Sequence, residues 1–148
     1  MPQPYPVTRS EAEWRQRLTP EQYAVMRGHG TEAPGSCALL HEKRRGRFTC
    51  AGCNSPLFDA EVKFESGTGW PSFYAPYDET HVTAVRDTSH GMVRIETRCA
   101  RCDSHQGHLF PDGPAPTRLR YCINSVSLSF VPQDEDLPDP LGRGDHLP

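Results

Sequence analysis

Cysteine thiols are the most reactive side chains of this 148-residue chain, and four of its six cysteines are spaced as metal ligands. Cys50 and Cys53 form one CxxC pair, and Cys99 and Cys102 form another. Two such pairs can bind one ion in a closed tetrahedral site of the structural zinc kind. A redox dithiol is the alternative, which is disfavoured because neither pair lies in a βαβ pattern. We therefore predict one structural Zn²⁺, although Fe(II) also fits four thiolates.

Cys122 lies outside these pairs, in the segment RYCINS, with Arg120 two residues before it and Asn124 two residues after it. A thiol reacts as the thiolate, and a neighbouring cation favours that form. His105 and His108, in SHQGHLF, could supply an acid or a base to this thiol. The competing interpretation is that Cys122 is an inert core thiol and that both histidines are solvated turn residues.

Trp70 is a second candidate for a pocket, because Gly69 and Pro71 hold it in the segment SGTGWPSFY (66–74). An indole fixed in this way can form the wall of a pocket for a small apolar group. From the residue alone, a tryptophan that simply fills the core is an equally good interpretation.

Two short helices are expected ahead of these residues. Ser10 and Glu13 have the spacing of a capping box, which predicts a helix through Leu18. The segment TPEQ (19–22) repeats the signal, and it predicts a second helix that ends at Gly28 and Gly30.

Alternation of side chains predicts strands over 81–85, 92–98 and 120–131. In the second strand, one face carries Met92, Arg94, Glu96 and Arg98. In the third, one face carries Arg120, Cys122, Asn124, Val126, Leu128 and Phe130. This pattern predicts that Cys122 shares a strand face with core residues, at the mouth of a pocket. The predicted fold is mainly β, with antiparallel strands, two small helices in front and zinc knuckles that join strands.

The composition agrees with many short elements, because hydrophobic residues make up 35% of the chain and it contains 15 Pro and 12 Gly. The net charge of −3 argues against a nucleic-acid surface. No segment approaches the roughly 20 apolar residues of a membrane span, and the N-terminus shows no apolar signal core, so we expect a cytoplasmic protein. We expect one domain over 1–131, with 1–9 as a loose arm, and a disordered acidic, Pro-rich tail over 132–148.

Five segments together resemble the peptide-methionine (R)-S-oxide reductases, the B-type methionine sulfoxide reductases. They are LTPEQYAVMRGHGTE (18–32), CAGCNSPLF (50–58), SGTGWPSF (66–73), CARCDSHQGHLFPDGP (99–114) and RYCINSVSLSF (120–130). They follow the family's order over nearly the whole folded part. The resemblance implies a β-tent-like fold of two antiparallel sheets, with zinc on the four paired cysteines.

The resemblance also implies the chemistry. The Cys122 thiolate would attack the sulfoxide sulfur of methionine-R-sulfoxide in a peptide or protein and become a sulfenic acid. His105 and His108 would supply a proton and order water, with Asn124 assisting, and Arg120 would stabilise the thiolate.

Three further residues receive roles from the same resemblance. Asp112 would orient a histidine. Trp70 and Phe110 would bind the substrate, with Trp70 as the wall against its S-methyl group, and the handedness of the pocket would select the R epimer.

The chain departs from the common family pattern at Thr68, where many members carry a cysteine that converts the sulfenic acid to a disulfide. Four zinc thiols and one nucleophile leave only Cys37, in the unpatterned 31–47 segment. We expect Cys37 to resolve Cys122, which requires Cα atoms within about 7 Å, and a thioredoxin-type protein to reduce the disulfide. The alternative is that an outside thiol reduces the sulfenic acid directly.

Two other classes compete with a monomeric reductase. A zinc-stabilised β binding module could share this architecture, but the acidic charge disfavours nucleic acid as its partner. A cysteine hydrolase would need an oxyanion motif, which is not evident in the sequence.

Overall fold

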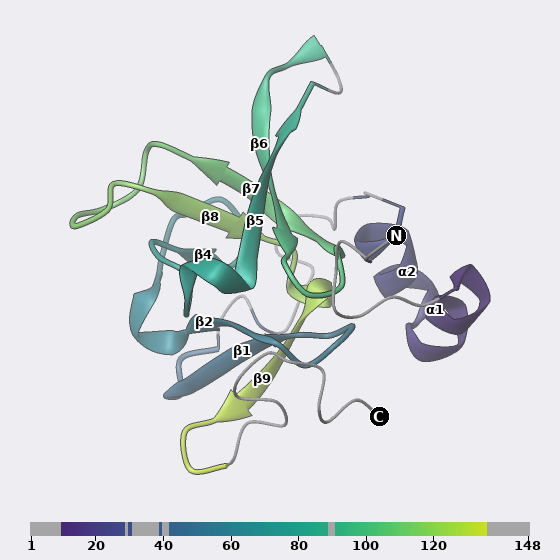
Figure 1. Cartoon of the computed structure of the whole chain (residues 1–148). Coiled ribbons are helices and arrows are strands. Elements are labelled where there is room, and N and C mark those ends of the chain that lie inside the picture. The colour runs from purple at the N-terminus through teal and green to yellow at the C-terminus, as the bar shows by residue number, and fades with distance from the viewer. Residues whose placement is uncertain (1–9, 29, 31–38, 40–41, 89–90, 136–148) are drawn as a thin grey trace.

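The computed structural model describes residues 10–28, 30, 39, 42–88 and 91–135, and it consists of two antiparallel sheets with two short helices beside them (Figure 1). The three-stranded sheet has the order β2-β1-β9, and the six-stranded sheet has the order β3-β4-β8-β7-β6-β5. The bounds of the strands are β1 Gly46–Cys50, β2 Pro56–Asp59, β3 Lys63–Phe64, β4 Ser72–Phe73, β5 Val82–Asp87, β6 Arg94–Cys99, β7 His105–Phe110, β8 Arg120–Ile123 and β9 Leu128–Pro132. The mainly β class with two antiparallel sheets is confirmed.

Helices α1 (Glu11–Arg17) and α2 (Pro20–Met26) both begin with the capping box that the sequence predicts. In the first, Glu13 N donates to Ser10 Oγ at 3.2 Å while Ser10 N donates to Glu13 Oε1 at 3.0 Å. Helices of 7 residues are marginal alone, so their apolar side chains must be packed against the body. Trp14 is buried against Gly52, in the turn of the first CxxC pair, where a Cβ would lie 3.0 Å from the indole.

The core lies between the two sheets and contains a cluster of aromatic rings. Phe58 of β2 stacks on Phe73 of β4 with ring centroids 4.3 Å apart, and Phe48 of β1 meets Phe73 edge-on at 5.2 Å. Tyr121 and Ile123 of β8 are buried in the same cluster. Because successive side chains of a strand point to opposite faces, Cys122 must project from the face of β8 that points away from this core.

The prediction of one strand over 120–131 is wrong. The chain leaves the six-stranded sheet after Ile123, passes through a 3₁₀ turn (η5, Ser125–Ser127) and enters the three-stranded sheet as β9. Ser125 and Ser127 are buried in this crossover, and Ser127 N donates to Asn124 O at 3.0 Å. Cys122 therefore does not share a strand face with Leu128 or Phe130.

The other predicted strands over 81–85 and 92–98 correspond to β5 and β6, which pair as a hairpin that extends away from the smaller sheet (Figure 1). Short 3₁₀ turns, η2 (Ala60–Val62) and η3 (Glu79–His81), precede β3 and β5. The predicted arm 1–9 and most of the predicted tail lie outside the described residues. The start of that tail is bonded to the body, because Arg47 donates to Glu135 O at 2.7 Å. Within the described residues, no helix has the length and apolar character needed to cross a membrane.

Candidate active site

Cys122 is surrounded by its neighbours in the six-stranded sheet. In register it lies between Ser72 of β4 on one side and His108 of β7 on the other. Residues directly opposite each other on antiparallel strands point to the same face, with Cβ atoms about 5 Å apart. The sheet therefore places the His108 imidazole beside the thiol, which is only partly buried.

The two histidines share a face because β7 contains a bulge. Thr97 of β6 pairs with Gly107, but the next residue, Arg98, pairs with His105, so Gln106 is the extra residue. In a regular strand, residues three apart point to opposite faces, and one extra residue brings them to the same face. The His105 and His108 rings meet edge-on with centroids 5.5 Å apart.

A hollow of about 110 Å³ opens over this face. Its lining side chains and backbone come from Trp70, Arg94, Gly107, His108, Phe110, Cys122 and Asn124. The Trp70 loop is fixed to β8, because Ile123 N donates to Pro71 O at 3.0 Å, and Gly69 allows the turn with a φ of +88°. Five of the residues singled out in the sequence thus lie around one hollow.

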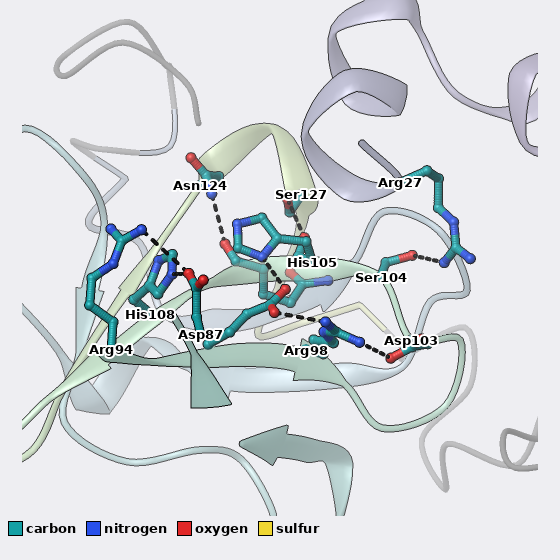
Figure 2. Close-up of polar contacts among 12 residues, drawn as sticks. Arg27, Asp87, Arg94, Arg98, Asp103, Ser104, His105, His108, Asn124 and Ser127 are labelled. Atoms are coloured by element: carbon teal, nitrogen blue, oxygen red, sulfur yellow. Dashed lines mark hydrogen bonds and ion pairs between the residues drawn. The ribbon is translucent and has the colours of Figure 1, made fainter. Parts of the chain in front are cut away.

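Asn124 lies at the point where β8 ends. Its backbone N and its side-chain Nδ2 both donate to Gln106 O, at 2.8 and 3.1 Å. The side chain is thereby tied to the bulge that aligns the histidines (Figure 2). Asn124 is buried, so it belongs to the inner end of the hollow.

Arg120 contacts Asp112, and this corrects the expectation that Asp112 orients a histidine. The guanidinium donates to both carboxylate oxygens, at 2.8 and 3.2 Å, and lies 4.4 Å from the centroid of the Phe110 ring. The hydrogen bond from Arg120 lowers the pKa of Asp112. The pKa of Arg120 is raised, chiefly by its hydrogen bond with Asp112 and to a smaller extent by Cys122.

The carboxylates that do contact the histidines are Glu96 and Asp87, which sequence reasoning missed. Glu96 Oε2 lies 2.6 Å from His105 Nδ1, and Asp87 Oδ2 lies 2.7 Å from His108 Nε2 (Figure 2). Burial disfavours the charged form of Glu96, but hydrogen bonds with Arg98 and His105 outweigh this and lower its pKa. The available signal was the alternation of β6, which puts Arg94 and Glu96 on one face.

The two CxxC pairs converge as a candidate metal site. All four thiol sulfurs are buried and lie within 4.8 Å of one another. The Cys50–Cys102 and Cys53–Cys99 sulfur distances are 3.7 and 3.6 Å. A tetrahedron with Zn–S bonds of about 2.3 Å has sulfur–sulfur edges of about 3.8 Å, so the residues fit a four-thiolate zinc site.

Both halves of this site use the same turn. In CAGCNS and CARCDS, the residue after the second cysteine is left-handed, with a φ of 68° at Asn54 and 63° at Asp103. Asn and Asp tolerate this conformation better than other non-glycine residues. The amide of Gln106, the bulge residue, reaches Cys50 Sγ at 3.5 Å. The metal site thus supports the bulge in β7.

Comparison with known proteins agrees with this architecture. Residues 18–132 match the family model described as the SelR domain. The chain belongs to the SelR family. A peptide methionine sulfoxide reductase MsrB from Caulobacter vibrioides (strain NA1000 / CB15N) is 66% identical over 143 residues, 96% of this chain and 90% of the relative. The protein of the same name from Pseudomonas putida (strain GB-1) is 60% identical over 122 residues, 82% of this chain and 93% of the relative. The resemblance to the MsrB family is confirmed.

The SelR match includes Thr68, where the chain departs from the common family pattern, and Cys37, the predicted resolving cysteine. Thr68 belongs to a hydroxyl cluster in which Ser66 Oγ lies 2.7 Å from Thr68 Oγ1 and 2.8 Å from Ser72 Oγ. Ser72 is the cross-strand partner of Cys122. The hydroxyl cluster therefore lies beside Cys122, whereas Cys37 lies outside the described residues.

Proposed function

We propose that this chain reduces methionine-R-sulfoxide in peptides and proteins, with Cys122 as the nucleophile. The observation that carries the proposal is the 110 Å³ hollow that holds a partly exposed thiol beside an imidazole and two aromatic rings. This volume is below the roughly 300–1,000 Å³ of sites that enclose whole small molecules. It suits the end of one side chain, with the rest of the polypeptide outside.

In the first step, the thiolate sulfur attacks the sulfoxide sulfur and the oxygen is transferred to Cys122. One proton is taken up, the sulfur–oxygen bond of the substrate breaks, and the products are methionine and a Cys122 sulfenic acid. Sulfoxide oxygen must be protonated or hydrogen-bonded as this charge develops, and we assign the supply of the proton to His108, which lines the hollow, and His105, whose ring meets that of His108 edge-on. Arg120 favours the thiolate, and Asn124 positions the substrate oxygen or a water molecule.

The substrate's methyl group would pack against Trp70 and Phe110. These rings line the same hollow as Cys122. A sulfoxide sulfur is a stereocentre, so a site that fixes its methyl group and its oxygen at once accepts one epimer only. The R epimer follows from membership in the MsrB family.

For recycling, the Cys37 thiol would attack the Cys122 sulfenic acid and release water, and a thioredoxin dithiol would reduce the resulting disulfide. Thr68 has no thiol for this step. The proposal includes a cytoplasmic location, since reduced thioredoxin is a cytoplasmic reductant. It also includes action as a monomer.

Zn²⁺ is the metal proposed for Cys50, Cys53, Cys99 and Cys102. Four thiolates complete its coordination and leave no position for substrate, so its contribution is to hold the knuckles together. The reaction steps then fall to the chain's own residues.

The test is NADPH consumption coupled to thioredoxin and its reductase, with separated R and S epimers of a peptide methionine sulfoxide. Turnover on the R epimer alone is expected. If methionine is released from the R epimer with dithiothreitol but not with thioredoxin, the proposed reduction by Cys122 is supported and recycling through Cys37 is refuted. Absence of turnover on both epimers, with metal bound and the protein folded, would favour the binding-module interpretation.

The matching variant is Cys37→Ser. With thioredoxin as the sole reductant, it should release about one methionine per enzyme and then stall, because the sulfenic acid has no partner thiol. Sustained thioredoxin-driven turnover by this variant would refute the role of Cys37.

A further inference from the structure

We propose that Asp87 is a positioning residue of the active site, which fixes the His108 imidazole in the tautomer that directs Nδ1 toward Cys122 and the substrate. This inference rests on the proposed function, because it assigns a task within that reaction. Asp87 is the last residue of β5, two strands away from β7, and nothing in its sequence neighbourhood indicates the site.

The contact itself is short and shielded. His108 Nε2 lies 2.7 Å from Asp87 Oδ2, and the two side chains are only 13% and 17% exposed. A carboxylate can only accept, so Nε2 must carry the hydrogen in this bond. Nδ1 is then the ring nitrogen that remains for the thiol or the sulfoxide. Since His108 is the direct cross-strand neighbour of Cys122 and both line the hollow, this nitrogen lies where the reaction takes place.

Asp87 is held in turn by Arg94. The two residues are partners in the β5–β6 ladder, and Arg94 Nη2 lies 3.3 Å from the same oxygen that His108 contacts. In Figure 2, dashed lines join the Asp87 carboxylate to both the Arg94 guanidinium and the His108 imidazole. Arg94 also lines the hollow, so it restrains Asp87 from the substrate side. The carboxylate thus has two fixed partners and little freedom to rotate.

The two histidines are held through different ring nitrogens, which gives the two rings different tasks. Glu96 engages Nδ1 of His105, whereas Asp87 engages Nε2 of His108. Only His108 has Cys122 as its register partner. The arrangement of thiol, imidazole and carboxylate follows the general logic of an activated nucleophile, in which a third group orients the base.

The proton balance is simple. Neutral His108, with its hydrogen on Nε2, accepts the thiol proton of Cys122 at Nδ1, which leaves a thiolate and an imidazolium. When Nδ1 then gives this proton to the sulfoxide oxygen, the ring becomes neutral again with its hydrogen on Nε2. Asp87 remains ionised and keeps the same hydrogen bond throughout, so neither the ring nor the carboxylate has to reorient during the step. Without the carboxylate, the neutral ring is free to carry its hydrogen on Nδ1, and Nδ1 then cannot accept the thiol proton.

The test combines histidine ¹⁵N NMR with single-turnover kinetics on the metal-loaded protein. In the wild type, the neutral His108 ring should carry its proton on Nε2, and in Asp87→Asn the Nδ1 tautomer should appear. Single-turnover methionine release by Asp87→Asn should fall by about 10- to 100-fold, with KM changed less than about twofold. A merely structural role would move neither the tautomer nor the ratio of kcat to KM in this way.

The matched control is Asp78→Asn, the same chemical change in the turn before β5, where Asp78 Oδ1 accepts from Thr80 N at 2.8 Å. Asn also serves in such a cap, so the tautomer and the rate should be unchanged. A wild-type His108 protonated on Nδ1 would overturn the proposal, and so would an Asp87→Asn rate within about twofold of the wild type. Wild-type protein that releases no methionine would refute the proposed function instead, and the tautomer would still decide the role of Asp87.

Discussion

Gly107 lies between the two histidines of β7, and its replacement by alanine tests how the sheet positions Cys122, the proposed nucleophile. A Cβ built on Gly107 would lie 1.9 Å from Cys122 O and 2.9 Å from Ile123 Cα, whereas real Cβ contacts essentially never fall below 3.0 Å. The obstructing atoms are backbone, so no side-chain rotation can relieve the clash. Strands β7 and β8 must separate locally by roughly 1 Å.

The size of the effect follows from this displacement. Overpacking that moves backbone costs about 1–3 kcal/mol and occasionally more, so we expect Gly107→Ala to lose about 3 kcal/mol of unfolding free energy. For a domain of this length, that corresponds to a melting temperature lower by roughly 10 °C. A shift of about 1 Å between Cys122 and His108 should also reduce the single-turnover rate about 100-fold.

The assays are urea unfolding and single-turnover methionine release at a temperature where the variant is folded. The urea midpoint should fall without a change in slope. Gly91→Ala is the control, because a Cβ there meets nothing within 4 Å and only the positive φ of 70° is strained. It should cost about 1 kcal/mol and leave the rate unchanged. If Gly107→Ala behaves like this control in both assays, the reasoning from strand spacing is refuted.

Three further predictions concern the metal, a buried ion pair and recycling. Removal of the metal by a strong chelator should lower the thermal midpoint sharply, because metal binding contributes folding free energy; an unchanged midpoint would contradict a structural site. Hydrogen bonds with Arg98 and His105 lower the pKa of Glu96 in the folded protein. The Glu96 carboxylate therefore stabilises the fold at any pH above the pKa of an unfolded glutamate, about 4.3, and this stabilisation is lost as the pH falls through the lower pKa of the folded protein. When the pH is lowered from 5 to 3, the thermal midpoint of Glu96→Gln should therefore fall less than that of the wild type. Equal decreases in the two proteins would contradict this prediction. Adding Thr68→Cys to Cys37→Ser should restore thioredoxin-driven turnover, and a double variant that still stalls would show that position 68 does not reach the nucleophile.

Several features could be read from the sequence because they depend on residues close together in the chain. The capping boxes at Ser10 and Thr19 join a side chain to the backbone three residues later, so sequence spacing alone predicts both helices. The CxxC pairs work in the same way, since each turn brings two sulfurs to one point. The alternation over 81–85 and 92–98 predicted strands, and five ordered motifs indicated the family before any fold was known.

Only the tertiary structure decided which side chains meet across the sheet. Alternation over 120–131 looked like one strand, but buried serines at 125 and 127 mark a crossover between sheets, and the core face of β8 proved to be the face opposite Cys122. Asp112 was expected beside a histidine and instead pairs with Arg120. The carboxylates that contact the histidines come from β5 and β6. Cross-strand neighbours depend on strand order, register and a bulge, and these are set by long-range packing rather than by separation along the chain.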